Sequence, residues 1–157
     1  MFSFSHKHKP PTESQITIWA LKRNKLTGRE IAERIDVDPG YVSRSIKEAN
    51  KRIRGMLEEA ARMNKIKLVF INSELGIAQG HSHIFNISAH ITFSPKNGLQ
   101  VWYEHKGDCT SCEEFSDCRE TLIQEFKERN IKIPNKSLRP TDLSDLLFKK
   151  IKEMSER

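Results

Sequence analysis

Cysteine is scarce in this chain of 157 residues, and the three cysteines that it has all lie within residues 109–118. An odd number of closely spaced cysteines argues against a disulfide framework and leaves free thiols or a metal site. Long apolar runs are also missing, because no stretch approaches the roughly 18 residues that a membrane-spanning helix needs. The first residues, MFSFSHKHKPP, lack the continuous apolar core of a secretory signal. We therefore expect a cytoplasmic protein without a membrane partner.

The signatures of common enzyme classes are absent as well. The sequence contains no nucleophile elbow, phosphate-binding glycine loop, dinucleotide-binding fingerprint or zinc-protease motif. Glu113 and Glu114 lie within the cysteine stretch, where acidic side chains are ordinarily solvated. We expect a protein that is not an enzyme.

The excess of positive over negative charge lies entirely in the first half of the chain. Residues 1–65 contain 14 Lys and Arg against 8 Asp and Glu, whereas residues 66–157 contain 13 of each, and the net charge is +6. This asymmetry is typical of a nucleic-acid-binding head joined to a neutral body.

Apolar residues at helical spacing predict three helices in the basic half. The first follows Thr12, the second follows Thr27, and the third begins at Pro39. Apolar positions of the third helix continue in steps of three and four along one seam: Val42, Ile46, Ala49, Ile53, Met56, Ala60 and Met63. Such a seam can pair with its own copy in a homodimer or pack on a second domain, and the sequence leaves both alternatives open.

From Lys65 the apolar pattern changes to a period of two. KIKLVFI, IFNISAHITF and LQVWYEH predict three strands, and two helices are expected after Cys118 and after Pro140. The chain is therefore predicted to be α+β. We expect an N-terminal domain of three helices at residues 1–65, with a long connecting third helix, and a small antiparallel sheet with two helices at residues 66–157.

One segment of the basic half carries a recognisable motif. LTGREIAERIDVDPGYVSRSIKEANKRI, residues 26–53, resembles the helix-turn-helix of the fourth region of sigma factors and of LuxR-type and related archaeal regulators. The resemblance depends on small Ala32 at the helix crossing, on Val37 in the turn and on the PGYVSRSI start of a recognition helix. Asp36 replaces the usual left-handed Gly, and Asp tolerates that conformation better than most residues. The resemblance implies a transcription regulator that binds specific sequences of double-stranded DNA.

Helical geometry identifies the side chains that would contact DNA. If Val42 and Ile46 face the core, the polar residues between them point outward and can reach base edges or phosphates. Two residues at the start of the second helix lie where that helix would cross the DNA backbone. The predicted DNA-binding set is Thr27, Arg29, Tyr41, Ser43, Arg44, Lys47 and Lys51. The alternative is a helical module that binds protein, as in an adaptor of the transcription apparatus.

The cysteines form the pattern C-x2-C-x5-C, which suits a metal site. Cys109, Cys112 and Cys118 supply three soft ligands, and His105 is the nearest candidate for a fourth, so that a zinc ion could be bound. The pattern also resembles the iron–sulfur loop of endonuclease III-type DNA glycosylases, but Trp102 occupies the position of their upstream cysteine. Zinc, an iron–sulfur cluster and free thiols stay open, and a nucleic-acid enzyme with an iron–sulfur loop is an alternative function.

A second group of metal-ligating residues is less specific. His81 and His83 flank Ser82 in QGHSH, and His90 lies on a neighbouring predicted strand, so the three histidines are candidates for a ligand pocket. The whole sequence favours a DNA-binding regulator whose second domain carries a cysteine-ligated metal, either structural or sensing redox or metal status. The letters do not specify the target sequence, the signal, or whether transcription is activated or repressed.

Overall fold

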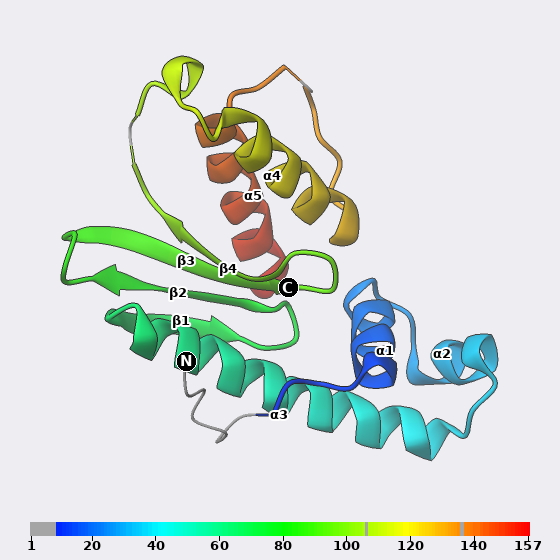
Figure 1. Cartoon of the computed structure of the whole chain (residues 1–157). Coiled ribbons are helices and arrows are strands. Elements are labelled where there is room, and N and C mark those ends of the chain that lie inside the picture. Colours follow the sequence, from blue (N-terminus) through cyan, green and yellow to red (C-terminus); the bar gives the residue numbers. More distant parts are fainter. Residues whose placement is uncertain (1–8, 106, 136) are drawn as a thin grey trace.

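The computed structural model describes residues 9–105, 107–135 and 137–157, and the described chain has an α+β fold (Figure 1). These residues form five α-helices, one short 3-10 helix and a four-stranded antiparallel sheet. The helices are α1 (Glu13–Arg23), α2 (Gly28–Ile35), α3 (Pro39–Met63), α4 (Phe115–Glu128) and α5 (Pro140–Ser155). The strands are β1 (Ile66–Asn72), β2 (Ile77–Ser82), β3 (Ile87–Ser94) and β4 (Gly98–Tyr103).

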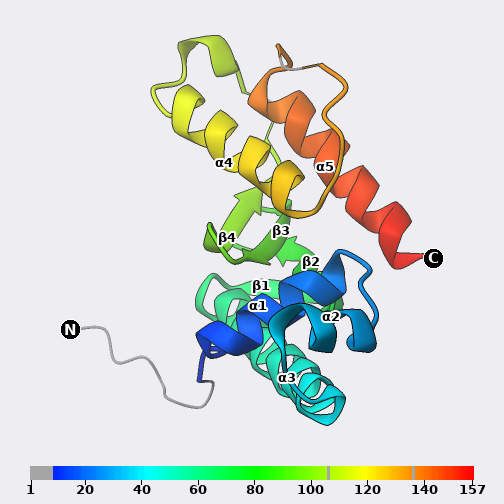
Figure 2. The same cartoon turned by 90° about the vertical axis from the view of Figure 1, so that its right-hand side faces the viewer.

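The sheet is the middle of three layers. Its strands lie in the order β1-β2-β3-β4, with α3 on one face and the pair α4 and α5 on the other (Figures 1 and 2). Side chains alternate between the two faces, as expected in a strand. Ala78 and Ile91 belong to the core with α3, whereas the adjacent Ile77 belongs to the core with α4 and α5.

Each of the first three helices starts at a residue that satisfies its free N–H groups. Thr12 and Thr27 form capping boxes with Gln15 and Glu30, in which each threonine hydroxyl accepts from the backbone N–H of the partner and each threonine N–H donates to the partner's side-chain oxygen. Asp38 accepts from Tyr41 N–H at the start of α3. Such caps typically contribute about 1 kcal/mol each. The three predicted helix starts are confirmed.

The core under α3 extends across the predicted domain boundary. It joins Trp19 of α1 and Leu57 of α3 to Ile91 of β3, and Trp19 Nε1 also donates to Ser73 O at 3.0 Å, just after β1. The predicted boundary between residues 65 and 66 therefore lies at a turn of the chain, and residues from both sides of it belong to one apolar core.

The predicted seam of α3 is largely buried inside the chain. Ala49, Ile53 and Ala60 belong to the core shared with the sheet, and Met63 at the helix end is 54% exposed. The structure thus has the second of the two alternatives, in which the seam packs on the other half of the chain. A homodimer stays a prediction, and it needs a different surface.

The prediction of three strands is wrong in one respect, because a fourth strand, β2, pairs with both β1 and β3. Its sequence, IAQGHS, has little β-branched character and contains a glycine, so the propensity rules do not mark it as a strand. Residues 84–86, which were expected to begin the next strand, lie in the β2–β3 turn. Gly76 ends the β1–β2 turn at φ +63°, where an added Cβ would lie 2.6 Å from Phe93 O.

A buried polar network holds α4 against the end of the sheet. Glu125 accepts through Oε1 from Ser94 Oγ (2.6 Å) and Asn97 Nδ2 (2.9 Å), and through Oε2 from Arg129 Nε (3.0 Å). Both charged side chains are at most 1% exposed. The other guanidinium nitrogens of Arg129 donate to the backbone carbonyls of Leu75, Gly76 and Phe93.

Within the ranges that the structure describes, no helix combines the length and the apolar character that crossing a membrane requires.

Candidate nucleic-acid interface and cysteine loop

Helices α2 and the start of α3 form a small separate core with α1. Ile18, Ile31, Ala32 and Val42 are at most 3% exposed and pack together. Asp36 ends α2 in the left-handed conformation, with φ 54° and ψ 57°, so the two helices are joined by a turn of only a few residues. Small side chains at this crossing let α2 and α3 approach closely.

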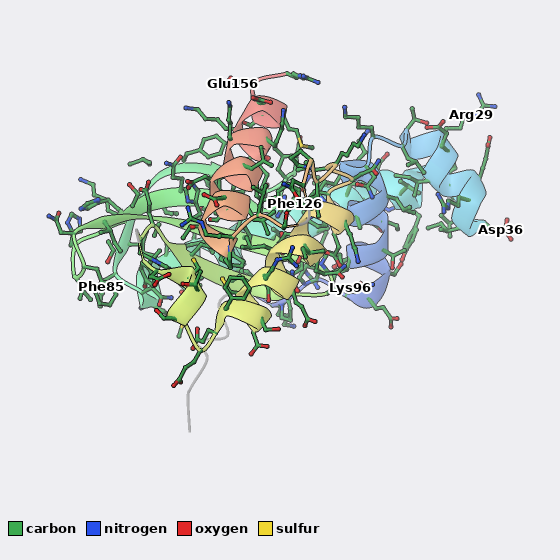
Figure 3. The ribbon with its side chains drawn as sticks, turned by 90° about the horizontal axis from the view of Figure 1, so that it is seen from above. Arg29, Asp36, Phe85, Lys96, Phe126 and Glu156 are labelled. Atoms are coloured by element: carbon green, nitrogen blue, oxygen red, sulfur yellow. The ribbon has the colours of Figure 1, made fainter. Side chains whose placement is uncertain are left out.

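All seven residues predicted to contact DNA have exposed side chains. They line the N-terminus of α2 and the first half of α3, whereas Val42, Ser45 and Ala49 of the same helix are buried. Figure 3 shows Arg29 and Asp36 together at one end of the molecule, with Phe85 of the β2–β3 turn at the opposite end. The N-terminus of α2 and the start of α3 therefore lie at one end of the molecule, and Lys51 lies further along, at the middle of α3.

Three of these residues already have partners within the chain. Tyr41 OH lies 2.9 Å from Ser14 Oγ of α1, which ties the start of α3 to the first helix. Arg29 Nε lies 3.4 Å from Glu33 Oε1 in a pair that is almost fully exposed. Thr27 Oγ1 accepts from Glu30 N–H. An exposed pair of this kind contributes little to stability, so Arg29 can exchange its partner at little cost.

The three cysteines are brought together at the start of α4. Cys109 begins the 3-10 helix Cys109–Ser111, and its carbonyl accepts from Cys112 N–H at 3.3 Å. Cys118 lies in the first turn of α4, where its N–H donates to Glu114 O. Cys109 is buried, Cys112 is exposed and Cys118 is half-buried, and all three are free thiols. Burial, and then the neighbouring Cys109, Cys112 and Glu114, raise the pKa of the Cys118 thiol.

The predicted fourth ligand, His105, follows β4 and is exposed. Its ring lies near Gly107, since a Cβ added there would be 3.1 Å from His105 Nδ1. Among the described residues, no group of three or more His, Cys, Asp and Glu side chains is arranged to hold a metal ion. The metal site predicted from the cysteine spacing stays a prediction.

The three histidines of the candidate ligand pocket do not converge on one point. His81 Nε2 lies 3.1 Å from Asn86 Oδ1, and the ring of His81 meets that of His83 edge to face at 5.6 Å. His90 stacks on Phe148 of α5 with ring centroids 3.9 Å apart. Burial lowers the pKa of His90, which favours its neutral form. The structure thus places His90 against α5, while His81 and His83 contact each other.

Buried charge at the ends of α1 and α4 was not predicted. Arg23 and Glu128 meet there, next to the pair of Glu125 and Arg129. One signal was present, because Glu125 and Arg129 are four residues apart, three positions after Leu122 and Phe126 of the same helix. That spacing places both charges on the apolar face.

Comparisons of the chain with protein-family models, with curated proteins and with solved structures find no match. Any assignment of function therefore depends on the residues themselves and on their arrangement.

Proposed function

We propose that the chain is a transcription regulator that binds specific sequences of double-stranded DNA through a helix-turn-helix formed by α2 and α3. The observation that carries the proposal is the division of α3, in which Val42, Ala49 and Ile53 are buried while the predicted contact residues of this helix are exposed, namely Tyr41, Ser43, Arg44, Lys47 and Lys51. A recognition helix needs this division, because one face holds the helix in the fold and the other enters the major groove.

The charge and the capping of the helices support the same proposal. Arg44 and Lys47 are the base-contact candidates, because an Arg or Lys can donate to the acceptors at the edge of a guanine. The N-terminus of α2, with Thr27 and Arg29, suits a phosphate oxygen. The excess of positive charge in residues 1–65 favours association with a polyanion.

The experiment measures the binding of duplexes selected from a random pool, at several salt concentrations. The double variant Arg44→Ala, Lys47→Ala should lose at least about tenfold in affinity, and the slope of log K against log salt should fall by about 1 to 2. The matched control Lys67→Ala, Lys149→Ala removes two exposed cations elsewhere and should bind as the wild type does. Equal affinity of the first variant and the wild type for every duplex would contradict the DNA interface and favour a protein-binding adaptor.

We also propose that Cys109, Cys112 and Cys118, completed by His105, hold zinc or an iron–sulfur cluster. The support is the donor chemistry and the folding of all three cysteines into one short segment between β4 and α4. Metal content and the visible spectrum of protein purified without oxygen test this. One colourless equivalent of zinc indicates a structural site, and a brown protein with iron and sulfide indicates a redox or gas sensor. Protein that carries neither, and takes up neither on reconstitution, contradicts the metal site.

A further inference from the structure

A cavity of about 280 Å³ lies where three helices end. Its wall is formed by the α1–α2 turn, by the residues after α4 and by the last turns of α5, which Figure 2 shows reaching down beside that turn. The volume is slightly below the range of about 300 to 1,000 Å³ that is usual for ligand pockets, so a small molecule would fill it. Any occupant would contact α1 on one side and α4 and α5 on the other.

The wall of the cavity is predominantly cationic. It contains Arg23, Lys25, Arg129, Lys150 and Arg157, and the only acidic side chain among the described wall residues is that of Glu153, which pairs with Lys150 at 3.1 Å. Glu125 and Glu128 behind the wall balance Arg129 and Arg23. The excess positive charge therefore belongs to the exposed cations at the mouth, where an anion can approach.

The two buried arginines of the wall differ in how well they are satisfied. Every guanidinium nitrogen of Arg129 donates to a protein oxygen. Arg23 is only 7% exposed, yet its Nε and Nη1 meet no acceptor in the described chain. Its Nη2 donates to Glu128 O at 3.0 Å and is 3.9 Å from Glu128 Oε2, and the guanidinium lies over the Trp19 ring at 4.6 Å.

This arrangement leaves buried donors that lack acceptors. A buried donor without an acceptor costs about 1 to 3 kcal/mol, and more when it is charged. Burial and the charge of Arg129 also lower the pKa of Arg23 to about 10. Nε and Nη1 of Arg23 have almost no accessible surface, so an anion in the cavity would act on them through its charge, which offsets the repulsion between the two guanidinium groups.

We propose that the cavity binds a small oxyanion with at least two negative charges, such as the phosphate or diphosphate group of a small molecule. Lys25 and Lys150 would contact the anion at the mouth, with Arg23 behind them, and the apolar side chains of Ile131 and Met154 would pack against an organic remainder. The bound molecule would link the α1–α2 turn to α4 and α5. This binding site is independent of the DNA interface.

Isothermal titration calorimetry with sodium pyrophosphate at constant ionic strength tests the site. The wild type should bind one equivalent, and the double variant Lys25→Gln, Lys150→Gln should bind at least tenfold more weakly, because two charge-assisted contacts are lost. Both lysines are exposed, so the variant should fold, which its circular dichroism checks. Lys149→Gln is the matched control on the same helix, since Lys149 is exposed and is not among the wall residues given for this cavity.

Two results would overturn the proposal. The first is that no protein binds pyrophosphate, or that Lys149→Gln weakens binding as much as Lys25→Gln, Lys150→Gln does. An equal loss in the control would be a nonspecific effect of positive charge. The second is that the wild type does not bind pyrophosphate, while the variant Lys25→Gln, Lys150→Gln reduces the slope of duplex affinity against salt concentration. In that case the cations contact the DNA backbone, and no small-molecule site exists. The Arg44→Ala, Lys47→Ala variant should still bind pyrophosphate, which separates this site from the proposed DNA interface.

Discussion

The two faces of the sheet are covered by helices in different ways. On the α3 face the buried residues are almost all apolar, from Ile53 and Leu57 on the helix to Ala89 and Ile91 on the strands. The α4–α5 face has its own apolar core. In addition it buries the ion pair of Glu125 and Arg129, which forms hydrogen bonds with residues at one end of the sheet.

The difference concerns how the position of each helix is determined. Apolar burial is not directional, so the position of α3 against the sheet is determined by the fit of the packed side chains and by the short connection to β1. Hydrogen bonds are directional, and Arg129 reaches the carbonyls of Leu75 and Gly76 in the β1–β2 turn and that of Phe93 in β3. The network therefore fixes α4 in one register against the sheet, which its apolar residues alone would specify less strictly.

The largest effect is expected when one half of the ion pair is removed. Arg129→Met should lower the free energy of unfolding by about 3 to 5 kcal/mol, because Glu125 and three carbonyls lose a buried partner. Urea unfolding followed by circular dichroism measures this. The double variant Glu125→Leu, Arg129→Met leaves no buried unpaired charge and should be more stable than Arg129→Met alone. If the double variant is the less stable of the two, the pair is not the source of the effect.

On the α3 face a large truncation should cost somewhat less. Leu57 is fully buried and has no polar role, so Leu57→Ala should lower the free energy of unfolding by about 3 kcal/mol through lost burial and a cavity. Conservative changes separate the faces further. Leu57→Met should cost below about 1.5 kcal/mol, whereas Arg129→Lys should cost more because an ammonium cannot reproduce the planar fork of donors. Equal costs for these two changes would remove the distinction between the faces.

The elements that could be predicted from the sequence are those whose signals are local. Thr12 and Thr27 mark helix starts through contacts with residues three positions later, Pro39 suits the first turn of a helix, and apolar spacing identifies the buried side of α3. The exposure of Arg44 and Lys47 follows from the same period. Strand β2 was missed because its pairing depends on neighbours on both sides, while its own residues include Gly80 and three polar side chains.

The candidate sites depend on contacts that the sequence does not reveal. The cavity brings together residues from the ends of α1, α4 and α5, more than a hundred positions apart. Arg23 looks like an ordinary helix-terminal cation, which favours the carbonyl end of a helix, whereas the spacing of Arg129 from Phe126 places it on the apolar face of α4. Only the packing of α4 against the sheet buries them. The cysteine spacing did predict that three thiols lie in one short segment, since that proximity is set by the chain itself.

The smallest expected effect concerns pH and again distinguishes the two faces. Burial under Phe148 lowers the pKa of His90, and the carboxylates of Glu104 and Asp145 oppose this in part. The unfolded chain, in which the pKa is about 6.5, therefore binds a proton more readily than the folded chain. The contribution of His90 to stability is fully present above about pH 6.5 and is lost as the pH falls toward the lowered value. His90→Gln should reduce this loss.

Urea unfolding of the wild type and of His90→Gln between pH 7.5 and pH 5 measures the difference. The comparison isolates His90, because the two proteins differ at this side chain alone. Leu57→Ala is the control from the other face, and its stability should follow the pH dependence of the wild type at a lower level. If the stability of His90→Gln instead falls with pH just as that of the wild type does, His90 binds a proton equally well in the folded and the unfolded chain. Its stacking on Phe148 would then contribute through packing alone, as the residues on the α3 face do.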